Sequence, residues 1–131
     1  MSESALAASY IRKAERALTS ARTLLKTKDS EGVCNRAYYA MFDAAHAALW
    51  AAGAREDGSI IKTHNGLVAA FGEGAVKSGA MAPEHGRALA HVLKTRLLAD
   101  YTADAPDIDD ARETVALAET FVAAVKEKFR L

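Results

Sequence analysis

Hydrophobic residues recur every three to four positions along nearly the whole chain, which contains only two prolines. This periodicity predicts an all-α protein, an up-and-down bundle of about five helices in a single domain, residues 1–131. The expected helices, taken with their capping residues, are 4–28, 29–53, 63–71, 83–101 and 108–129. Glycines at positions 72 and 74 are expected to fray the third helix, and residues 54–62 and 104–107 are expected to form loops.

Short polar side chains stand where these helices are expected to begin. Asp29 or Ser30, Thr63 and Asp107 can each accept a hydrogen bond from a free backbone N–H of the first turn. Pro83 suits the first turn of the fourth helix, where its missing N–H is not needed. On the fifth helix, the residues expected to face inward are Val115, Ala118, Phe121, Val122 and Val125. On the first, they are Leu6, Tyr10, Ala14, Ala17, Ala21, Leu24 and Leu25.

The second segment has an unusual composition, with eight alanines between Ala37 and Ala52. Its apolar residues spread nearly all the way round the helix, which is typical of a helix at the centre of a bundle or buried in an oligomer. At 100° per residue, one of its stripes consists of Asn35, Tyr39, Phe42, His46 and Leu49. We therefore expect His46 to be a buried histidine bonded to a neighbour.

Composition and charge narrow the function classes. Half of the residues are hydrophobic, so a core can form, and the 17 basic residues are balanced by 17 acidic ones. A net charge of zero argues against a general nucleic-acid coat protein, but it is compatible with a small local site for RNA or a nucleotide. The one cysteine, Cys34, cannot form an intrachain disulfide and is interpreted as a small core residue.

The sequence also predicts a cytoplasmic protein without membrane contact. The N-terminal residues lack the basic and apolar regions of a signal peptide. The uncharged stretch 44–54 is far shorter than the ~20 residues that a membrane helix needs.

Arg96 is the most informative polar residue, because helical geometry places it in line with an apolar stripe of the fourth helix. His85, Leu89, Val92 and Asp100 lie within about 80° of it. One interpretation is an ion pair with Asp100, four residues further on. The other is a guanidinium group at a subunit seam, positioned to hold a phosphate.

Four motifs, in this order, carry a resemblance to a known family. They are Asn35-Arg36-Ala37-Tyr38-Tyr39-Ala40-Met41-Phe42, then Lys62-Thr63-His64-Asn65-Gly66, then Phe71-Gly72 with Val76-Lys77-Ser78-Gly79, and finally Arg96 through Asp100-Tyr101. On these motifs the chain resembles the HEPN domain (higher eukaryote and prokaryote nucleotide-binding), in its short stand-alone bacterial and archaeal type. The resemblance implies a helical bundle that forms a homodimer through its central helices. It also implies a small nucleotidyltransferase partner, as in two-gene toxin–antitoxin modules.

Many HEPN proteins are ribonucleases that need no metal, and the resemblance implies the same chemistry here. Their motif is an arginine followed four to six residues later by a histidine, with both subunits contributing to one cleft. In this chain the corresponding positions after Arg96 are Asp100, Tyr101 and Thr102, and no histidine follows His91. The Asp-Tyr ending is typical of the stand-alone type. Two interpretations stay open: RNA or nucleotide binding with cleavage, and binding alone.

The predicted site therefore has two groups of residues. Arg96 is expected to hold a phosphate, Asp100 to orient Arg96, and Tyr101 to line the cleft as the third catalytic candidate. The candidates for substrate binding are Asn35, Tyr39 and His85, and because His85 lies eleven residues from Arg96, only a two-fold contact could bring it near the arginine of the other subunit.

The remaining polar residues predict no cofactor and no metal. His64 is interpreted as part of a helix start, and His91 as solvent-exposed. Asp43 and His46 form a single carboxylate-x-x-His pair, which is too few ligands for a di-iron bundle. The alternative to an RNA-directed protein is a non-catalytic interaction module, in which Arg96, Asp100 and Asn35 lock helix packing or bind a partner protein.

Overall fold

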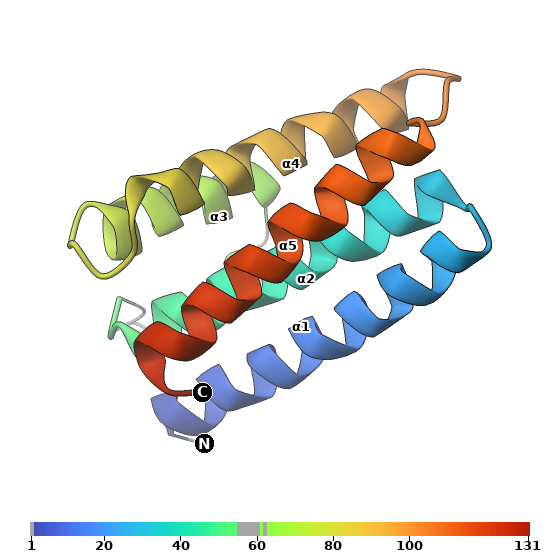
Figure 1. Cartoon of the computed structure of the whole chain (residues 1–131). Coiled ribbons are helices and arrows are strands. Elements are labelled where there is room, and N and C mark those ends of the chain that lie inside the picture. Colours follow the sequence, from blue (N-terminus) through green and yellow to red (C-terminus); the bar gives the residue numbers. More distant parts are fainter. Residues whose placement is uncertain (1, 55–60, 62) are drawn as a thin grey trace.

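The computed structural model describes residues 2–54, 61 and 63–131, and the expected loop 54–62 therefore lies almost wholly outside the described residues. Five α-helices and one π-helical turn account for most of the described chain (Figure 1). They are α1 (Glu3–Lys26), α2 (Ser30–Ala51), α3 (His64–Phe71), η1 (Gly72–Val76), α4 (Pro83–Tyr101) and α5 (Ile108–Phe129). The prediction of an all-α bundle is confirmed, and none of these helices is both long and apolar enough to cross a membrane.

The alanine-rich helix α2 lies at the centre of the bundle, as its composition predicts. It packs along α1 and α5, and the shorter α3 and the long α4 complete the molecule on the other side (Figure 1). The alanines of α2 between positions 37 and 48 are all fully buried. Because alanine side chains are small, they let neighbouring helices approach the α2 backbone closely, which is how one helix can contact all the others.

Side-chain caps begin the helices at the predicted places. The Asp29 carboxylate accepts a hydrogen bond from the Gly32 N–H at 3.0 Å, and the Thr63 hydroxyl accepts one from Gly66 at 2.9 Å. The Asp107 carboxylate does the same for Asp110, at 2.8 Å. Each cap satisfies a backbone donor that the first turn of a helix leaves free.

The ends of α1 and α2 are followed by residues in the left-handed conformation. Helix α1 stops at Lys26, two residues before the predicted end, because Lys28 has a φ of 61° and turns the chain. Helix α2 ends at Ala51, and Gly53, with a φ of 71°, lets the Ala54 N–H reach the Leu49 carbonyl oxygen at 3.0 Å. Gly53 closes α2 as expected, because glycine adopts this conformation without steric cost.

The inward-facing residues predicted for α5 are all buried. On the buried face of α1, the predicted Ala14, Ala17 and Ala21 are buried, but the prediction left out three other residues. Ala7, Ile11 and Leu18 form much of that face, whereas Leu6 and Tyr10 are only half-buried. The alternation of alanine with larger residues blurs the apolar stripe in the sequence.

The predicted fraying at Gly72 and Gly74 is wrong. Gly72 keeps helical angles (φ −58°, ψ −46°), and the chain continues into the π turn η1, in which the Lys77 N–H donates to the Gly72 carbonyl oxygen at 2.8 Å. A Cβ at Gly74 would lie 2.9 Å from the Leu49 side chain and 2.8 Å from that of Ala54. Close packing of η1 against the end of α2 therefore holds this segment helical.

This geometry predicts opposite effects for two neighbouring substitutions. Gly74→Ala is expected to lower the free energy of unfolding by about 1–3 kcal/mol, because the added methyl group overpacks the contact with α2. Gly72→Ala, where no atom lies within 4 Å of the new Cβ, is expected to raise it by about 0.5–1 kcal/mol. Urea unfolding of both variants beside wild type measures the difference, and equal midpoints would contradict the packing described here.

Candidate functional site

Arg96 lies against the aromatic side chains of α2. Its side chain is only 16% exposed, and its guanidinium carbon lies 4.9 Å from the ring centroid of Tyr38 and 5.0 Å from that of Tyr39. A cation over aromatic rings is attracted by their negative faces, and the attraction grows as water is excluded. Adjacent tyrosines on the central helix thus hold the charge that α4 brings to the bundle.

His64 completes the contact from a third helix. It is the first residue of α3, and the Thr63 cap fixes the start of that helix. The Nε2 atom of His64 lies 3.3 Å from Nη1 of Arg96, and its Nδ1 atom bonds the Tyr38 hydroxyl. The interpretation of His64 as only a helix start is therefore incomplete. Its ring connects the arginine of α4 to the tyrosine of α2.

The arginine determines which nitrogen of His64 carries the proton. A guanidinium group can only donate hydrogen bonds, so Nε2 of His64 must accept from Arg96 through its lone pair. In the neutral ring the proton then lies on Nδ1, which donates to the Tyr38 oxygen. The site thereby presents a basic ring nitrogen beside a fixed positive charge.

The surroundings favour the neutral forms of both His64 and Tyr38. Burial and the Arg96 charge lower the pKa of His64 from its ordinary value of 6.5, while Asp100 acts weakly in the other direction. Burial raises the pKa of Tyr38 to about 12, although the charge of Arg96 partly opposes this. At neutral pH the cluster of Arg96, His64, Tyr38 and Tyr39 (the arginine cluster) therefore carries one net positive charge before Asp100 is counted.

Asp100 forms the predicted ion pair with Arg96, with 3.8 Å between Oδ2 and Nε. The Asp100 side chain is about half exposed, and Nε of Arg96 is buried without a hydrogen-bond partner in the part of the chain that the structure describes. At this distance the carboxylate steadies the guanidinium group electrostatically but does not satisfy its donor. The pairing predicted from the spacing is confirmed.

The other predicted site residues lie at varying distances from the arginine cluster. Tyr39 is part of it, and Asn35 lies one turn earlier on α2, where it lines a separate hollow with Gly32 and Arg36. Tyr101 is 85% exposed at the end of α4. His85 packs on Phe121 of α5, with ring centroids 6.1 Å apart, about three turns from Arg96.

The burial predicted for His46 and the exposure predicted for His91 are confirmed. His46 is buried, 3% exposed, and stacks on Tyr10 with ring centroids 4.9 Å apart. His91 is exposed. Cys34 is buried, as expected, beside Thr114.

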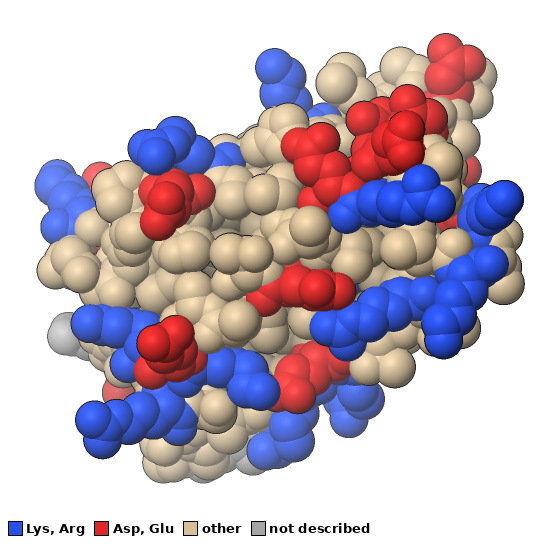
Figure 2. Space-filling model, in the orientation of Figure 1, with Lys and Arg blue, Asp and Glu red and all other residues tan. Residues whose placement is uncertain are grey.

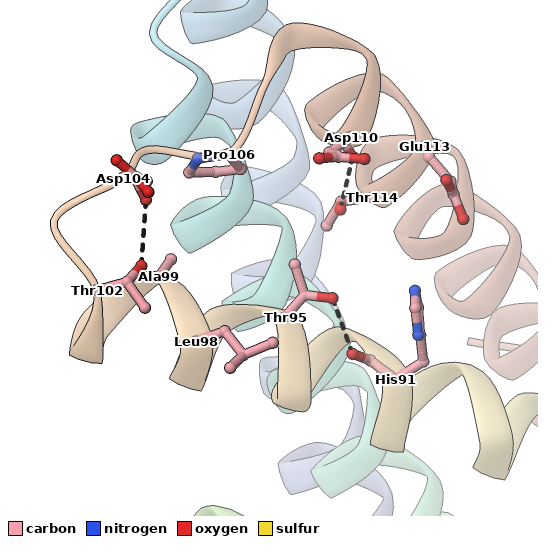
Figure 3. A pocket seen from close by; sticks show the side chains of 10 residues that line it. All are labelled: His91, Thr95, Leu98, Ala99, Thr102, Asp104, Pro106, Asp110, Glu113 and Thr114. Atoms are coloured by element: carbon pink, nitrogen blue, oxygen red, sulfur yellow. Dashed lines mark hydrogen bonds between the residues drawn. The ribbon is translucent and has the colours of Figure 1, made fainter.

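A cavity of about 360 Å³ lies on another face of α4, between the end of that helix and the start of α5 (Figure 3). The threonine hydroxyls that line it donate to backbone carbonyl oxygens nearby in the chain. Thr95 donates to His91, Thr114 to Asp110 and Thr102 to Asp104. The carboxylates of Asp104, Asp110 and Glu113 line the same cavity, and they would repel a phosphate. This cavity is therefore a poorer candidate for an anion than the arginine cluster.

Charged side chains of both signs are mixed over the molecular surface. On the face drawn in Figure 2, acidic residues gather over the start of α5 and basic residues lie along α1, without a single-sign field covering the molecule. Any anion site must therefore be local. Within the described residues, no group of three or more His, Cys, Asp or Glu side chains is placed to hold a metal ion.

Comparisons with known proteins agree with the all-α fold. The HEPN domain family matches residues 7–128, which is nearly the whole chain. A protein of Methanocaldococcus jannaschii named "Putative toxin MJ0605" is 32% identical over 117 residues, covering 89% of this chain and 84% of the relative. A UPF0332 protein of Thermotoga maritima is 29% identical over 117 residues, covering 88% and 85%. The chain belongs to the HEPN domain family.

The contact between His64 and Arg96 predicts a titration that depends on the arginine. In the wild-type protein the pKa of His64 is expected below 6.5, and in Arg96→Gln it is expected to rise toward 6.5, because one of its two lowering causes is removed. Proton NMR of the imidazole Cε1–H against pH measures both values. Arg87→Gln, an exposed change on the same helix, is the control.

The same lowered pKa gives a stability prediction with a definite sign. Near pH 6.5 the unfolded chain binds more protons at His64 than the folded protein does, so the free energy of unfolding should fall as the pH drops from 7 through this range. His64→Gln should flatten that part of the pH–stability curve. An unchanged slope in this variant would show that His64 is not held as described.

Proposed function

We propose that this protein is a toxin of a toxin–antitoxin module that binds RNA at the arginine cluster and cleaves it without a metal ion. The observation that carries the proposal is the 3.3 Å contact between Nη1 of Arg96 and Nε2 of His64. The family motif places its histidine four to six residues after the arginine on the same helix, where this chain has Asp100, Tyr101 and Thr102. His64 of α3 supports the same chemistry from a different element.

The residues suit attack of a ribose 2′-OH on its neighbouring phosphate. Arg96 binds a phosphate oxygen, turning its Nη1 from His64 to the substrate and stabilising the negative charge that develops on the non-bridging phosphate oxygens. The freed Nε2 of neutral His64 takes the 2′-OH proton. The O2′–P bond forms as the P–O5′ bond breaks, water supplies the proton to the leaving 5′ oxygen, and the products carry a 2′,3′-cyclic phosphate and a 5′-OH.

The name of the Methanocaldococcus relative supports the toxin role, because that protein covers most of this chain. The family resemblance further supports a homodimer that is controlled by a small nucleotidyltransferase. In such a dimer the exposed Tyr101 of one subunit and His85 and Asn35 of the other would line one shared cleft. Asp100 keeps Arg96 directed into that cleft through its 3.8 Å ion pair.

Cleavage of a mixed RNA substrate in EDTA tests the proposal. Wild type is expected to cleave, and Arg96→Gln and His64→Gln are each expected to be slower by about 10²–10⁴, the usual contribution of a charge-stabilising or proton-transfer group. Arg87→Gln, an exposed change on α4, is the matched control and should cleave at the wild-type rate. The products of wild type should end in cyclic phosphate.

The pH profile separates a base from a packing residue. If neutral His64 accepts the proton, the cleavage rate falls as the pH is lowered through its depressed pKa. Folded wild-type protein that leaves RNA intact would overturn the enzymatic function and favour the non-catalytic interaction module. Cleavage that survives His64→Gln would remove that residue from the mechanism.

A further inference from the structure

A second group of basic side chains lies beside the arginine cluster, and the two groups share one aromatic ring. The guanidinium carbon of Arg36 lies 5.3 Å from the ring centroid of Tyr39, the same ring that Arg96 approaches at 5.0 Å. Arg36 also borders a hollow of about 240 Å³ between α1 and α2. This hollow is lined by Lys13, Arg16, Ala17, Ser20, Arg36 and Asp43.

The hollow carries an excess of positive charge. Three of its side chains are cationic, and Asp43 is the one carboxylate among the lining residues. Lys13 pairs with Asp43 at 3.9 Å, a distance too long for a hydrogen bond, and the Lys13 side chain is 55% exposed. Burial raises the pKa of Asp43 even though Lys13, Arg36 and Arg16 oppose the shift. The carboxylate therefore balances the three cations only in part.

Arg36 has a donor without an acceptor. Its Nε atom is buried, and no hydrogen-bond partner for it occurs among residues 2–54, 61 and 63–131. A buried donor of a charged group without a partner costs free energy, so native structures nearly always satisfy such donors. Because the guanidinium group of Arg36 lines the hollow, an anion bound there would lie within its reach.

We infer that this hollow is a second phosphate subsite, which binds the backbone of the RNA strand whose reacting phosphate lies at Arg96. The inference rests on the proposed function. Both guanidinium groups contact the ring of Tyr39, so one strand can run from Arg96 past this ring to Arg36, Arg16 and Lys13. Successive phosphates on a single strand bind such a track of positive charges without sequence preference.

The lining favours a phosphate over an acidic protein partner. Ala17 is the one apolar residue that lines the hollow. Protein interfaces are anchored by large apolar or aromatic side chains in a desolvated centre, and this hollow offers none. It offers charge and hydrogen-bond donors, which are what a phosphate needs.

Salt-dependent binding of a fluorescein-labelled single-stranded RNA, measured by anisotropy in EDTA, tests the subsite. Arg16→Gln is expected to weaken binding several-fold at low salt and to reduce the slope of log K against log salt by about 0.7, the value for one lost phosphate contact on a single strand. Arg16 is exposed, so the variant should fold. The matched control is Arg12→Gln, an exposed arginine of α1 that lies outside the hollow and should leave the slope unchanged.

A second variant should act in the opposite direction. Asp43→Asn keeps the side-chain shape but removes the negative charge that faces the hollow, so RNA binding should become tighter. If the cations serve only to neutralise Asp43, this variant lowers the melting temperature and leaves RNA affinity unchanged. That result would overturn the subsite.

The remaining outcomes separate the two proposals. Suppose that RNA binding is lost in Arg96→Gln, whereas Arg16→Gln binds RNA as tightly as the control Arg12→Gln. This result would overturn the subsite and leave the function at Arg96 intact. Binding lost in Arg16→Gln but unchanged in Arg96→Gln would support the hollow as an RNA site and overturn the role of Arg96. If polyaspartate displaces the labelled RNA as effectively as unlabelled RNA does, the hollow is a surface for acidic proteins and the subsite is overturned. The subsite is also overturned if the wild-type protein binds no RNA at low salt.

Discussion

The close packing of α1 and α5 against the alanine face of α2 is the constraint on which the rest of the molecule depends. Alanines fill the centre of α2, so its few large side chains are concentrated at other positions around the helix. Tyr38, Tyr39 and Phe42 are among them, and they meet the residues that α3 and α4 contribute. The candidate site is thus built on the helix that the core fixes most firmly, which is what precise positioning of functional groups requires.

Covering a guanidinium group is costly unless its charge is compensated. Here the compensation is divided among two tyrosine rings, a neutral histidine and a half-exposed carboxylate, none of which fully satisfies the arginine. A purely structural ion pair is usually either exposed or well hydrogen-bonded. Arg96 and Arg36 differ from such pairs, because each keeps a buried Nε donor without a partner among the described residues.

The helices and most of their caps follow from the sequence because they depend on local spacing, as at Asp29, Thr63 and Asp107. The Arg96–Asp100 pair is likewise local, one turn apart on one helix. The contact of His64 with Arg96 joins residues 32 positions apart on different helices. The periodicity within one helix cannot predict a contact between two helices. The π turn after α3 could not be predicted from the sequence either. Glycines at 72 and 74 usually indicate the end of a helix, and only the structure shows that Gly74 fits tightly against Leu49.

The histidine that approaches Arg96 belongs to a helix of only eight residues, capped by Thr63 and continued by a π turn. The long helices α1, α2 and α5 form the most extensive contacts with one another, and α3 contributes far fewer. Short elements with few contacts open locally at lower free energy than the bundle unfolds. Opening of α3 would move the His64 ring away from Arg96 while the rest of the bundle persists, so whatever depends on this contact depends on the local stability of one short helix.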